Sequence, residues 1–498
     1  MRVLEGLSPE KVFYYFEDIC RIPHGSGNTG KISDYLVEFA AKRGLAHYQD
    51  SVGNVIIIKE ASEGYENHPP VMLQGHMDMV AVKKPDCDID MRTEGLRLKT
   101  EGDAVWAEGT SLGGDDGIAV AYGLALLDGQ YRHPRIELVI TVDEEVGMDG
   151  ARAIDLSPCR AKTLINLDSE DEGIFLAGCA GGARVNYSLE YEQSPLSGLP
   201  CSIEIAGLKG GHSGAEIQKG RGNANGLLGR ILTELGTAVD FGIRTLAGGL
   251  ADNAIPRQAE AHIMVTGYRD GGNGYRYGTE GFEAETCRRL VGEALAKMEK
   301  DLAFELAQKD PGVKIEHSFQ DAGMESCMGE ADARRIAAFV NTVPGGVQAM
   351  SGAMEGLVET SLNLGILECA EGKLKMGISV RSSLESAKYA LIGRLKDLAL
   401  LSGAGVQVTG DYPGWAYRSQ SPLREKMAAL YEEMFRRTPQ IQAIHAGLEC
   451  GLFAHKIPDL DCVSIGPAMK NIHTTEEELC ISSTERMWRF LIKLLEEM

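Results

Sequence analysis

The sequence lacks any apolar run of the roughly 18 residues that a membrane-spanning helix needs. Its opening segment, MRVLEGLSPEKVFYYFEDIC, also lacks the uninterrupted apolar core and the small-residue cleavage site of a secretory signal. None of the 11 cysteines forms a C-x-x-C pair, and scattered cysteines in a large chain without an export signal indicate reduced thiols. These absences predict a cytoplasmic protein that neither spans a membrane nor depends on disulfides.

Basic residues are few relative to acidic ones. Lysine and arginine total 50 against 72 aspartates and glutamates, which gives a formal net charge of −22. A chain of this charge repels a phosphate backbone, so we expect no nucleic-acid partner. The acidic excess would suit cations near a site, although most of it is typical of an ordinary solvated surface.

The length and the order of patterns predict two domains. A chain of 498 residues exceeds the roughly 250 to 300 that share one hydrophobic core. Residues 1–185 alternate helical patterns such as KISDYLVEFAAKRG with strand patterns such as RIELVITVDEE, which is typical of an α/β domain with buried central strands. Longer alternating strands mixed with helices follow in residues 186–409, and the α/β pattern resumes in residues 410–498. We therefore predict an α/β domain that carries an inserted α+β domain.

A histidine and an aspartate stand where the buried strand PPVMLQG should end. In QGHMDMV, His76 and Asp78 are two residues apart, so on a strand they share one face. That spacing suits a metal-binding imidazole that a carboxylate holds from behind. A polar strand end, in which Asp78 caps a turn, explains this motif equally well by itself.

Two pairs of acids follow at similar positions. Asp115 and Asp116 open a helix after two glycines in SLGGDDG, where acids also occur simply as helix caps. Glu144 and Glu145 end the next strand in TVDEEVG, and strand alternation would point them in different directions. The two glutamates should therefore have different tasks.

The last two candidates complete a set that suits metal ions. Asp168 ends a strand in NLDSE, and His473 lies near the carboxyl terminus in KNIHTTEE. Sites in open α/β sheets gather at the carboxyl ends of strands. Histidine nitrogens with carboxylate oxygens suit Zn²⁺ or Mn²⁺. A shared carboxylate could hold two ions roughly 3.5 to 4 Å apart, an arrangement that hydrolases use to activate water.

Seven motifs together resemble those of the co-catalytic zinc exopeptidases, the family of aminoacylase and carboxypeptidase G. They are QGHMDMV, GTSLGGDDG, DEEVGMDGA, NLDSE, KGGHSG, DNAIPR and IHTTEE, and the resemblance covers essentially the whole chain. It implies a mixed-sheet catalytic domain with a lid, two divalent ions per chain (zinc, with manganese or cobalt as alternatives), and hydrolysis of unblocked dipeptides, Xaa-His among them. Carried over to this sequence, it assigns one metal to His76 and Asp168, the other to Glu145 and His473, and the bridge to Asp115.

The resemblance also assigns residues that are not ligands. Asp78 would orient His76, and Glu144 would be the general base. Many relatives have a lysine shortly after the bridging aspartate, where this chain reads DDGIA. That departure fits the dipeptidase branch of the family and separates the chain from the deacylases.

The inserted domain contributes three further candidates. By the resemblance, His212 in KGGHSG would stabilise the oxyanion, and Asn253 in DNAIP would support the substrate. Arg381 in SVRSS could form a bidentate ion pair with the substrate carboxylate. An exposed turn histidine and an ordinary strand-surface arginine remain the alternatives for the first and the last.

The expected partners are dipeptide substrates, and a homodimer is left open. The alternative activities on the same site are N-acyl amino-acid deacylase and tripeptide aminopeptidase, and a protein that kept the fold without its metals is an alternative of another class. His445 and Glu449, in HAGLECG, lie in a segment similar to one that lines the family's site, and no role is assigned to them.

Overall fold

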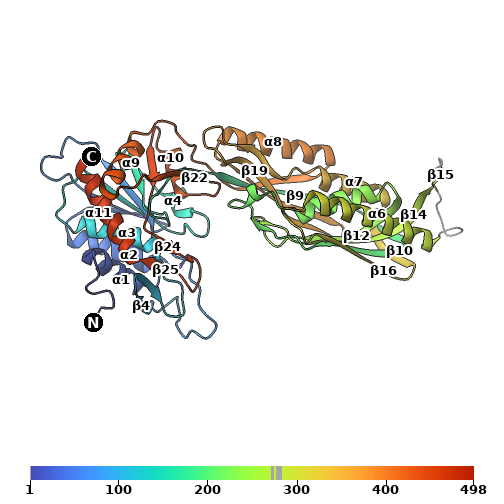
Figure 1. The fold of residues 1–498 in the computed structure, drawn as a ribbon, viewed down its shortest axis with the longest axis horizontal. Coiled ribbons are helices and arrows are strands. Elements are labelled where there is room, and N and C mark those ends of the chain that lie inside the picture. The colour runs from blue at the N-terminus through green and yellow to red at the C-terminus, as the bar shows by residue number, and fades with distance from the viewer. Residues whose placement is uncertain (1, 271–273, 276–282) are drawn as a thin grey trace. The chain divides into compact units, whose positions relative to one another are not determined.

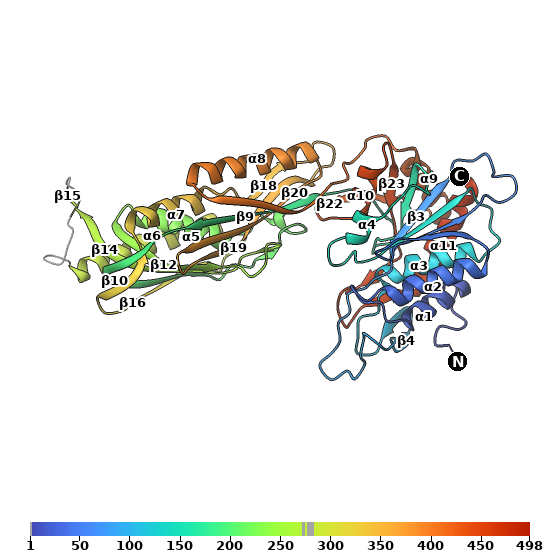
Figure 2. The same cartoon turned by 180° about the vertical axis from the view of Figure 1, so that it is seen from behind.

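The computed structural model of the chain describes residues 2–270, 274–275 and 283–498. Among these residues, no helix combines the length and the apolar character that crossing a membrane requires. Figures 1 and 2 show the ribbon from opposite sides. The chain divides into two compact units, one made of Met1–Cys179, Trp415–Ala443 and Leu448–Met498, the other of Ala180–Gly414 and Ile444–Gly447.

The unit boundaries differ from the residues predicted from the sequence pattern. The predicted changes at 185/186 and 409/410 fall inside β9 (Gly181–Glu190) and β21 (Gly405–Tyr412). These two strands pair with each other, so both belong wholly to the second unit. The short return of Ile444–Gly447 to that unit has no sequence signal. The division of labour between a catalytic domain and a lid stays a prediction.

The first unit is built on an eight-stranded sheet in the order β1-β2-β6-β3-β7-β23-β8-β22. Its central strands β6, β3, β7 and β23 run parallel. Every residue of β3 and β6 is buried, as expected for parallel strands covered on both faces. The strands are β1 (Ala46–Gln49), β2 (Val55–Lys59), β3 (Val71–His76), β6 (Ile136–Thr141), β7 (Thr163–Asn166), β8 (Ile174–Cys179), β22 (Gln440–Ile444) and β23 (Asp461–Ser464).

Helices cover this sheet. Side chains from five of them, α1, α2, α3, α9 and α11, share one apolar core with the sheet, and Figure 2 shows α1, α2 and α3 on the same side of it. The two short helices α4 and α10 contribute nothing to that core and contact each other. The helices are α1 (Glu10–Cys20), α2 (Gly30–Lys42), α3 (Gly114–Leu127), α4 (Asp149–Ala153), α9 (Pro422–Phe435), α10 (Glu449–Lys456) and α11 (Ile481–Glu497).

A small four-stranded sheet in the first unit has the order β24-β25-β5-β4. Its strands are β4 (Leu98–Glu101), β5 (Ala104–Ala107), β24 (Met469–Lys470) and β25 (Glu478–Cys480). The last two form an antiparallel hairpin, and residues 471–477 are its loop. This hairpin loop carries His473.

The second unit is an antiparallel sheet of 11 strands with helices packed on it. Figures 1 and 2 show its four long helices on one face of the sheet, and their apolar side chains share a core with the strands. The helices are α5 (Ala224–Leu235), α6 (Ala284–Glu305), α7 (Glu330–Thr342) and α8 (Glu385–Ser402), besides the short 3₁₀ turn η1 (Ile217–Lys219). In addition to β9 and β21, the sheet contains β10 (Gln193–Ala206), β12 (Val239–Gly248), β14 (Ala259–Asp270), β15 (Gly274–Tyr275), β16 (Lys314–Phe319), β17 (Gly323–Met328), β18 (Gly346–Met350), β19 (Val358–Ala370) and β20 (Lys373–Ser382).

The α/β first unit and the α+β second unit confirm the predicted fold class. A separate two-stranded ladder in the second unit joins β11 (Gly211–His212) to β13 (Ala254–Ile255). In the first unit, parallel pairing brings the carboxyl ends of β3, β6 and β7 to one edge, and the polar side chains singled out in the sequence follow those ends.

Candidate metal centre

His76 is the last residue of β3, and its ring is held from behind by Asp78. The ring Nδ1 lies 2.9 Å from the backbone carbonyl of Asp78 and 3.4 Å from its carboxylate Oδ1. Both side chains are buried. Because Nδ1 is engaged on this side, Nε2 is the ring atom that faces the neighbouring carboxylates.

Asp115 stands between two histidines. Its Oδ1 lies 3.2 Å from Nε2 of His76, and its Oδ2 lies 3.1 Å from Nε2 of His473. The residue comes from the non-helical first turn of α3, while His473 comes from the hairpin loop after β24. Each oxygen of this one carboxylate therefore faces a different imidazole.

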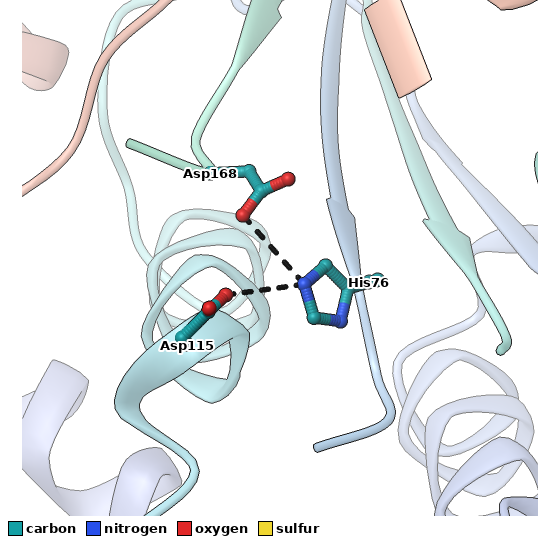
Figure 3. A group of neighbouring side chains, drawn as sticks. All are labelled: His76, Asp115 and Asp168. Carbon is teal, nitrogen blue, oxygen red and sulfur yellow. Dashed lines mark hydrogen bonds and ion pairs between the residues drawn. The ribbon is translucent and has the colours of Figure 1, made fainter. Parts of the chain in front are cut away.

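Two further carboxylates complete two groups that share Asp115. Figure 3 shows Asp168, from the loop after β7, facing the same His76 nitrogen, and the two atoms are 3.6 Å apart. On the other side, Glu145 Oε1 lies 2.8 Å from His473 Nε2. In each group the potential ligand atoms lie within 4.8 Å of one another. The structure thus brings together all five residues that the sequence singled out as ligands.

The charges of this cluster indicate a place for cations. In the described part of the chain, all ion pairs of Asp115, Glu145 and Asp168 are with histidine. Hydrogen bonds to Asp115 and Glu145 raise the pKa of His473 to about 10. Burial raises the pKa of Asp168 to about 6, against the pull of His76. In the absence of a metal ion, protons on these side chains reduce the repulsion between the carboxylates. The nitrogen and oxygen atoms of the cluster form a donor set that suits Zn²⁺ or Mn²⁺.

Asp78 also fixes the segment that carries the two glutamates. Its Oδ1 accepts the backbone N–H of Glu144 at 3.0 Å, and its Oδ2 accepts the hydroxyl of Ser26 at 2.8 Å and the N–H of Glu145 at 3.4 Å. Burial and the nearby carboxylates raise the pKa of Glu144 well above its usual range. Glu144 is therefore a carboxylate with a raised affinity for a proton, held beside the cluster.

The two glutamates separate for a reason other than the one expected from strand alternation. β6 ends at Thr141, so neither glutamate lies on the strand. Asp143 has a φ of 53°, and its carboxylate accepts the N–H of Gly27 at 2.7 Å, so the chain turns at this residue. The turn, and not the pleat of a strand, gives Glu144 and Glu145 their different environments.

Two buried glutamates in the first unit were not assigned a role from the sequence. Glu449 accepts hydrogen bonds from the hydroxyl of Thr141 at 2.7 Å and from the side-chain amide of Gln74, and burial raises its pKa to about 8. Glu477 accepts backbone N–H groups from the loop that leads to Asp115. Both residues lie within motifs of the sequence. The spacing of residues in a motif, however, does not indicate hydrogen bonds to partners so far away along the chain.

His212 and Asn253 are neighbours in the second unit. The β11–β13 ladder pairs His212 with Ala254, and Ser213 N–H donates to the carbonyl of Asn253 at 2.8 Å. His212 Nδ1 accepts the N–H groups of Gly214 and Ala215 at 3.2 and 3.0 Å, and burial lowers its pKa. Since Nδ1 accepts, the neutral ring carries its proton on Nε2 and can donate from there.

Arg381, on β20, lies beside His212 in the second unit. A Cβ atom placed on Gly214 would lie 3.0 Å from Cε1 of His212 and 3.2 Å from Cζ of Arg381, so both side chains border this glycine. Arg381 Nε is buried without a hydrogen-bond partner among the described residues. His445 is buried nearby, and burial together with the charge of Arg381 lowers its pKa to about 4. The second unit therefore gathers donor groups around Gly214.

Comparisons with known proteins identify the family of the chain. Residues 203–268 match the family model described as a peptidase dimerisation domain. The chain is 37% identical over 502 residues to the cytosol non-specific dipeptidase of Escherichia coli (strain K12), covering 100% of this chain and 99% of the relative.

Solved structures give the same result. The aminoacylhistidine dipeptidase of Vibrio alginolyticus superposes with a TM-score of 0.90 at 34% identity, covering 99% of this chain and 98% of that one. An M20 family metallo-carboxypeptidase of Sulfolobus solfataricus shares the fold, with a TM-score of 0.53 at 14% identity and 98% of each chain covered. The family resemblance predicted from the motifs is confirmed. On its full-length similarity to these dipeptidases, the chain belongs to the M20 family of metallopeptidases.

Proposed function

We propose that this chain hydrolyses the peptide bond of unblocked dipeptides, Xaa-His dipeptides among them. The observation that carries the proposal is the single carboxylate of Asp115, whose two oxygens face His76 and His473. The names of the two dipeptidases that match over the full length support the substrate class.

Two divalent ions, zinc in the first place and manganese or cobalt as alternatives, would be held by five residues. His76 and Asp168 would bind one ion, Glu145 and His473 the other, and Asp115 would bridge them. When bound, such a pair activates the attacking water and polarises the substrate carbonyl. The backbone carbonyl of Asp78, together with its carboxylate Oδ1, would keep the ring of His76 turned toward its ion.

Glu144 is the proposed general base. Its carboxylate would take a proton from the attacking water and pass that proton to the leaving amine. Burial beside other carboxylates raises its pKa, which suits a group that must hold a proton during the reaction. Asp78 would orient the segment through the N–H of Glu144.

We further propose substrate contacts for three residues of the second unit. His212 would donate from Nε2 to the developing oxyanion, because its Nδ1 is already an acceptor. Arg381 would bind the substrate carboxylate, and Asn253, whose side chain is exposed, would support the substrate. The match to a peptidase dimerisation domain supports a homodimer, and the cytosolic relative supports a cytoplasmic location.

A panel of four substrate classes would test the proposed specificity: free dipeptides, the same dipeptides acetylated at the amino terminus, N-acetyl amino acids, and tripeptides. We expect hydrolysis of the free dipeptides and little of the other three. Preferred hydrolysis of N-acetyl amino acids would replace the proposal with a deacylase, and preferred hydrolysis of tripeptides would replace it with an aminopeptidase.

A further inference from the structure

The carboxylate of Glu477 gathers four consecutive backbone amides. Its Oε2 accepts the N–H groups of Leu112 and Gly113 at 2.8 and 3.0 Å, and its Oε1 accepts those of Gly114 and Asp115 at 2.8 and 3.4 Å. The side chain is almost fully buried, with 3% of its surface exposed. One carboxylate therefore accepts hydrogen bonds from the last two residues before α3 and from the first two residues of this helix, Gly114 and Asp115.

The two glycines of the SLGGDD motif fit this arrangement. Gly113 has a φ of 67°, which glycine adopts without strain. A Cβ atom on Gly114 would lie 3.2 Å from Oε1 of Glu477 and 3.1 Å from Sδ of Met469, closer than ordinary contact allows. Gly113 thus lets the loop turn, and Gly114 leaves room for the glutamate.

Glu477 belongs to the same hairpin loop as His473. The loop residues 471–477 join β24 to β25, so the residue that faces Oδ2 of Asp115 and the residue that holds the backbone of Asp115 lie four positions apart. The N–H groups at the start of α3, which have no acceptor within the helix, also favour a negative charge such as that of Glu477. Fixing this hairpin against the loop therefore fixes His473 relative to Asp115.

We propose that Glu477 is a positioning residue of the metal centre: it holds the backbone of Asp115 so that the two carboxylate oxygens face two ions. The proposal rests on the metal ligands assigned in the proposed function. It predicts that Glu477 controls metal affinity without contacting a metal, as other residues that form hydrogen bonds to metal ligands do.

The alternative is that Glu477 only stabilises the fold by satisfying buried amides. Both roles would lower the unfolding temperature of a variant. Only the positioning role would also reduce the rise in unfolding temperature that zinc produces, because that rise depends on the affinity of the folded protein for zinc.

The test is the zinc affinity of the metal-free full-length chain, measured by competition with a chromophoric chelator. Glu477→Gln keeps the shape of the side chain but replaces one carboxylate oxygen by an NH₂ group. This group is a hydrogen-bond donor, and it would face two backbone N–H groups that are also donors. We expect this variant to bind zinc 10- to 100-fold more weakly, within the range that such groups show, and to lose part of the zinc-induced rise in unfolding temperature. Glu476→Gln is the matched control, since Glu476 is exposed and pairs with Lys84 at 2.6 Å; its zinc affinity should stay within about 2-fold of the unmodified chain.

Gly114→Ala changes the backbone side of the contact between Glu477 and residues 112–115. It tests the proposal independently if Glu477→Gln does not fold. We expect it to weaken zinc binding as well, because the added methyl group pushes against the carboxylate of Glu477. Zinc affinity within 2-fold of the unmodified chain in whichever of these variants fold would overturn the proposal, and so would an equal loss in Glu476→Gln. An unmodified chain that binds no zinc would overturn the metal centre itself, and the proposal with it.

Discussion

His473 Nε2 lies 3.1 Å from Oδ2 of Asp115, although 358 residues separate them in the sequence. The carboxyl-terminal hairpin thus completes a cluster whose other members all come from the first 170 residues. The cluster forms only when the first and last parts of the first unit fold together. Metal binding should therefore report on the integrity of the whole unit.

Asp115→Ala should remove both metal ions. In the proposed function this carboxylate would be the ligand common to the two sites, and its negative charge would also screen the repulsion between the ions. Elemental analysis of the purified variant should find far less than one equivalent of zinc per chain. Asp128→Asn, a change of another acid in the same unit that pairs with Lys11, should leave the metal content at the level of the unmodified chain. Two equivalents retained by Asp115→Ala would refute the bridge.

Glu144→Gln should separate catalysis from metal binding. Glutamine keeps the shape but cannot take a proton, so turnover of a dipeptide should fall by at least ~10²-fold. Zinc content should stay unchanged. The neighbouring Glu145→Gln should behave differently and lose zinc, because Glu145 pairs with His473 and is a proposed ligand of the same ion. Near-normal turnover in the Glu144 variant would show that another group is the base.

Arg381→Ala should mainly weaken substrate binding. Its guanidinium has a buried Nε without a partner in the described residues, so it has capacity for a carboxylate. We expect KM for free dipeptides to rise at least ~10-fold, with a smaller change in kcat. The same dipeptides amidated at the carboxyl terminus should be affected much less. Equal losses on free and amidated substrates would exclude Arg381 from carboxylate recognition.

Zinc binding to the metal-free chain should release protons. The pKa of His473 is raised to about 10 and that of His76 lies above its usual range, so both rings are protonated at neutral pH, whereas a metal binds the neutral ring. The apparent zinc affinity should therefore increase as the pH rises from 6 toward about 10. Calorimetry at pH 7 in buffers of different ionisation enthalpy measures the protons released. A heat independent of the buffer would contradict the protonated state.

The same pKa shift has the opposite consequence for the metal-free fold. Protonated His473 contributes stability that is fully present below the unfolded pKa of roughly 6.5. This contribution is lost as the pH rises through about 10, where the folded protein releases the proton. Raising the pH should thus destabilise the metal-free fold while it strengthens zinc binding.

Part of the candidate ligand cluster could be predicted because His76, Glu145 and Asp168 lie at or shortly after the ends of parallel strands. His76 is the last residue of β3 and Asp168 follows two residues after the end of β7, and the carboxyl ends of these parallel strands must meet at one edge of the sheet. The burial of Val71, Met72 and Leu73 in β3 follows from their apolar side chains, whereas the burial of Gln74 does not. The family motifs then indicated which residues to group.

Other features could not be predicted, because they depend on backbone conformation or on distant partners. The turn at Asp143 uses a φ of 53°, and although aspartate adopts such values more often than most residues, the sequence DEEVG does not show that it does so here. The bonds of Glu477 go to backbone amides 362 to 365 positions away, and backbone amides have no sequence signature. The return of Ile444–Gly447 to the second unit is likewise fixed by local contacts, such as the hydrogen bond from Ala180 N–H to the carbonyl of Ala446 at 3.0 Å.

The central claim is that this chain is a dipeptidase that works through the cluster around Asp115. The most direct test is the hydrolysis of a free dipeptide such as Ala-His by the full-length protein before metal removal, after metal removal, and after restoration with zinc or manganese. The account predicts that activity disappears with the metal and returns as about two equivalents per chain are restored. Unchanged hydrolysis by the metal-free protein, or no hydrolysis of any free dipeptide by the fully restored protein, would contradict it.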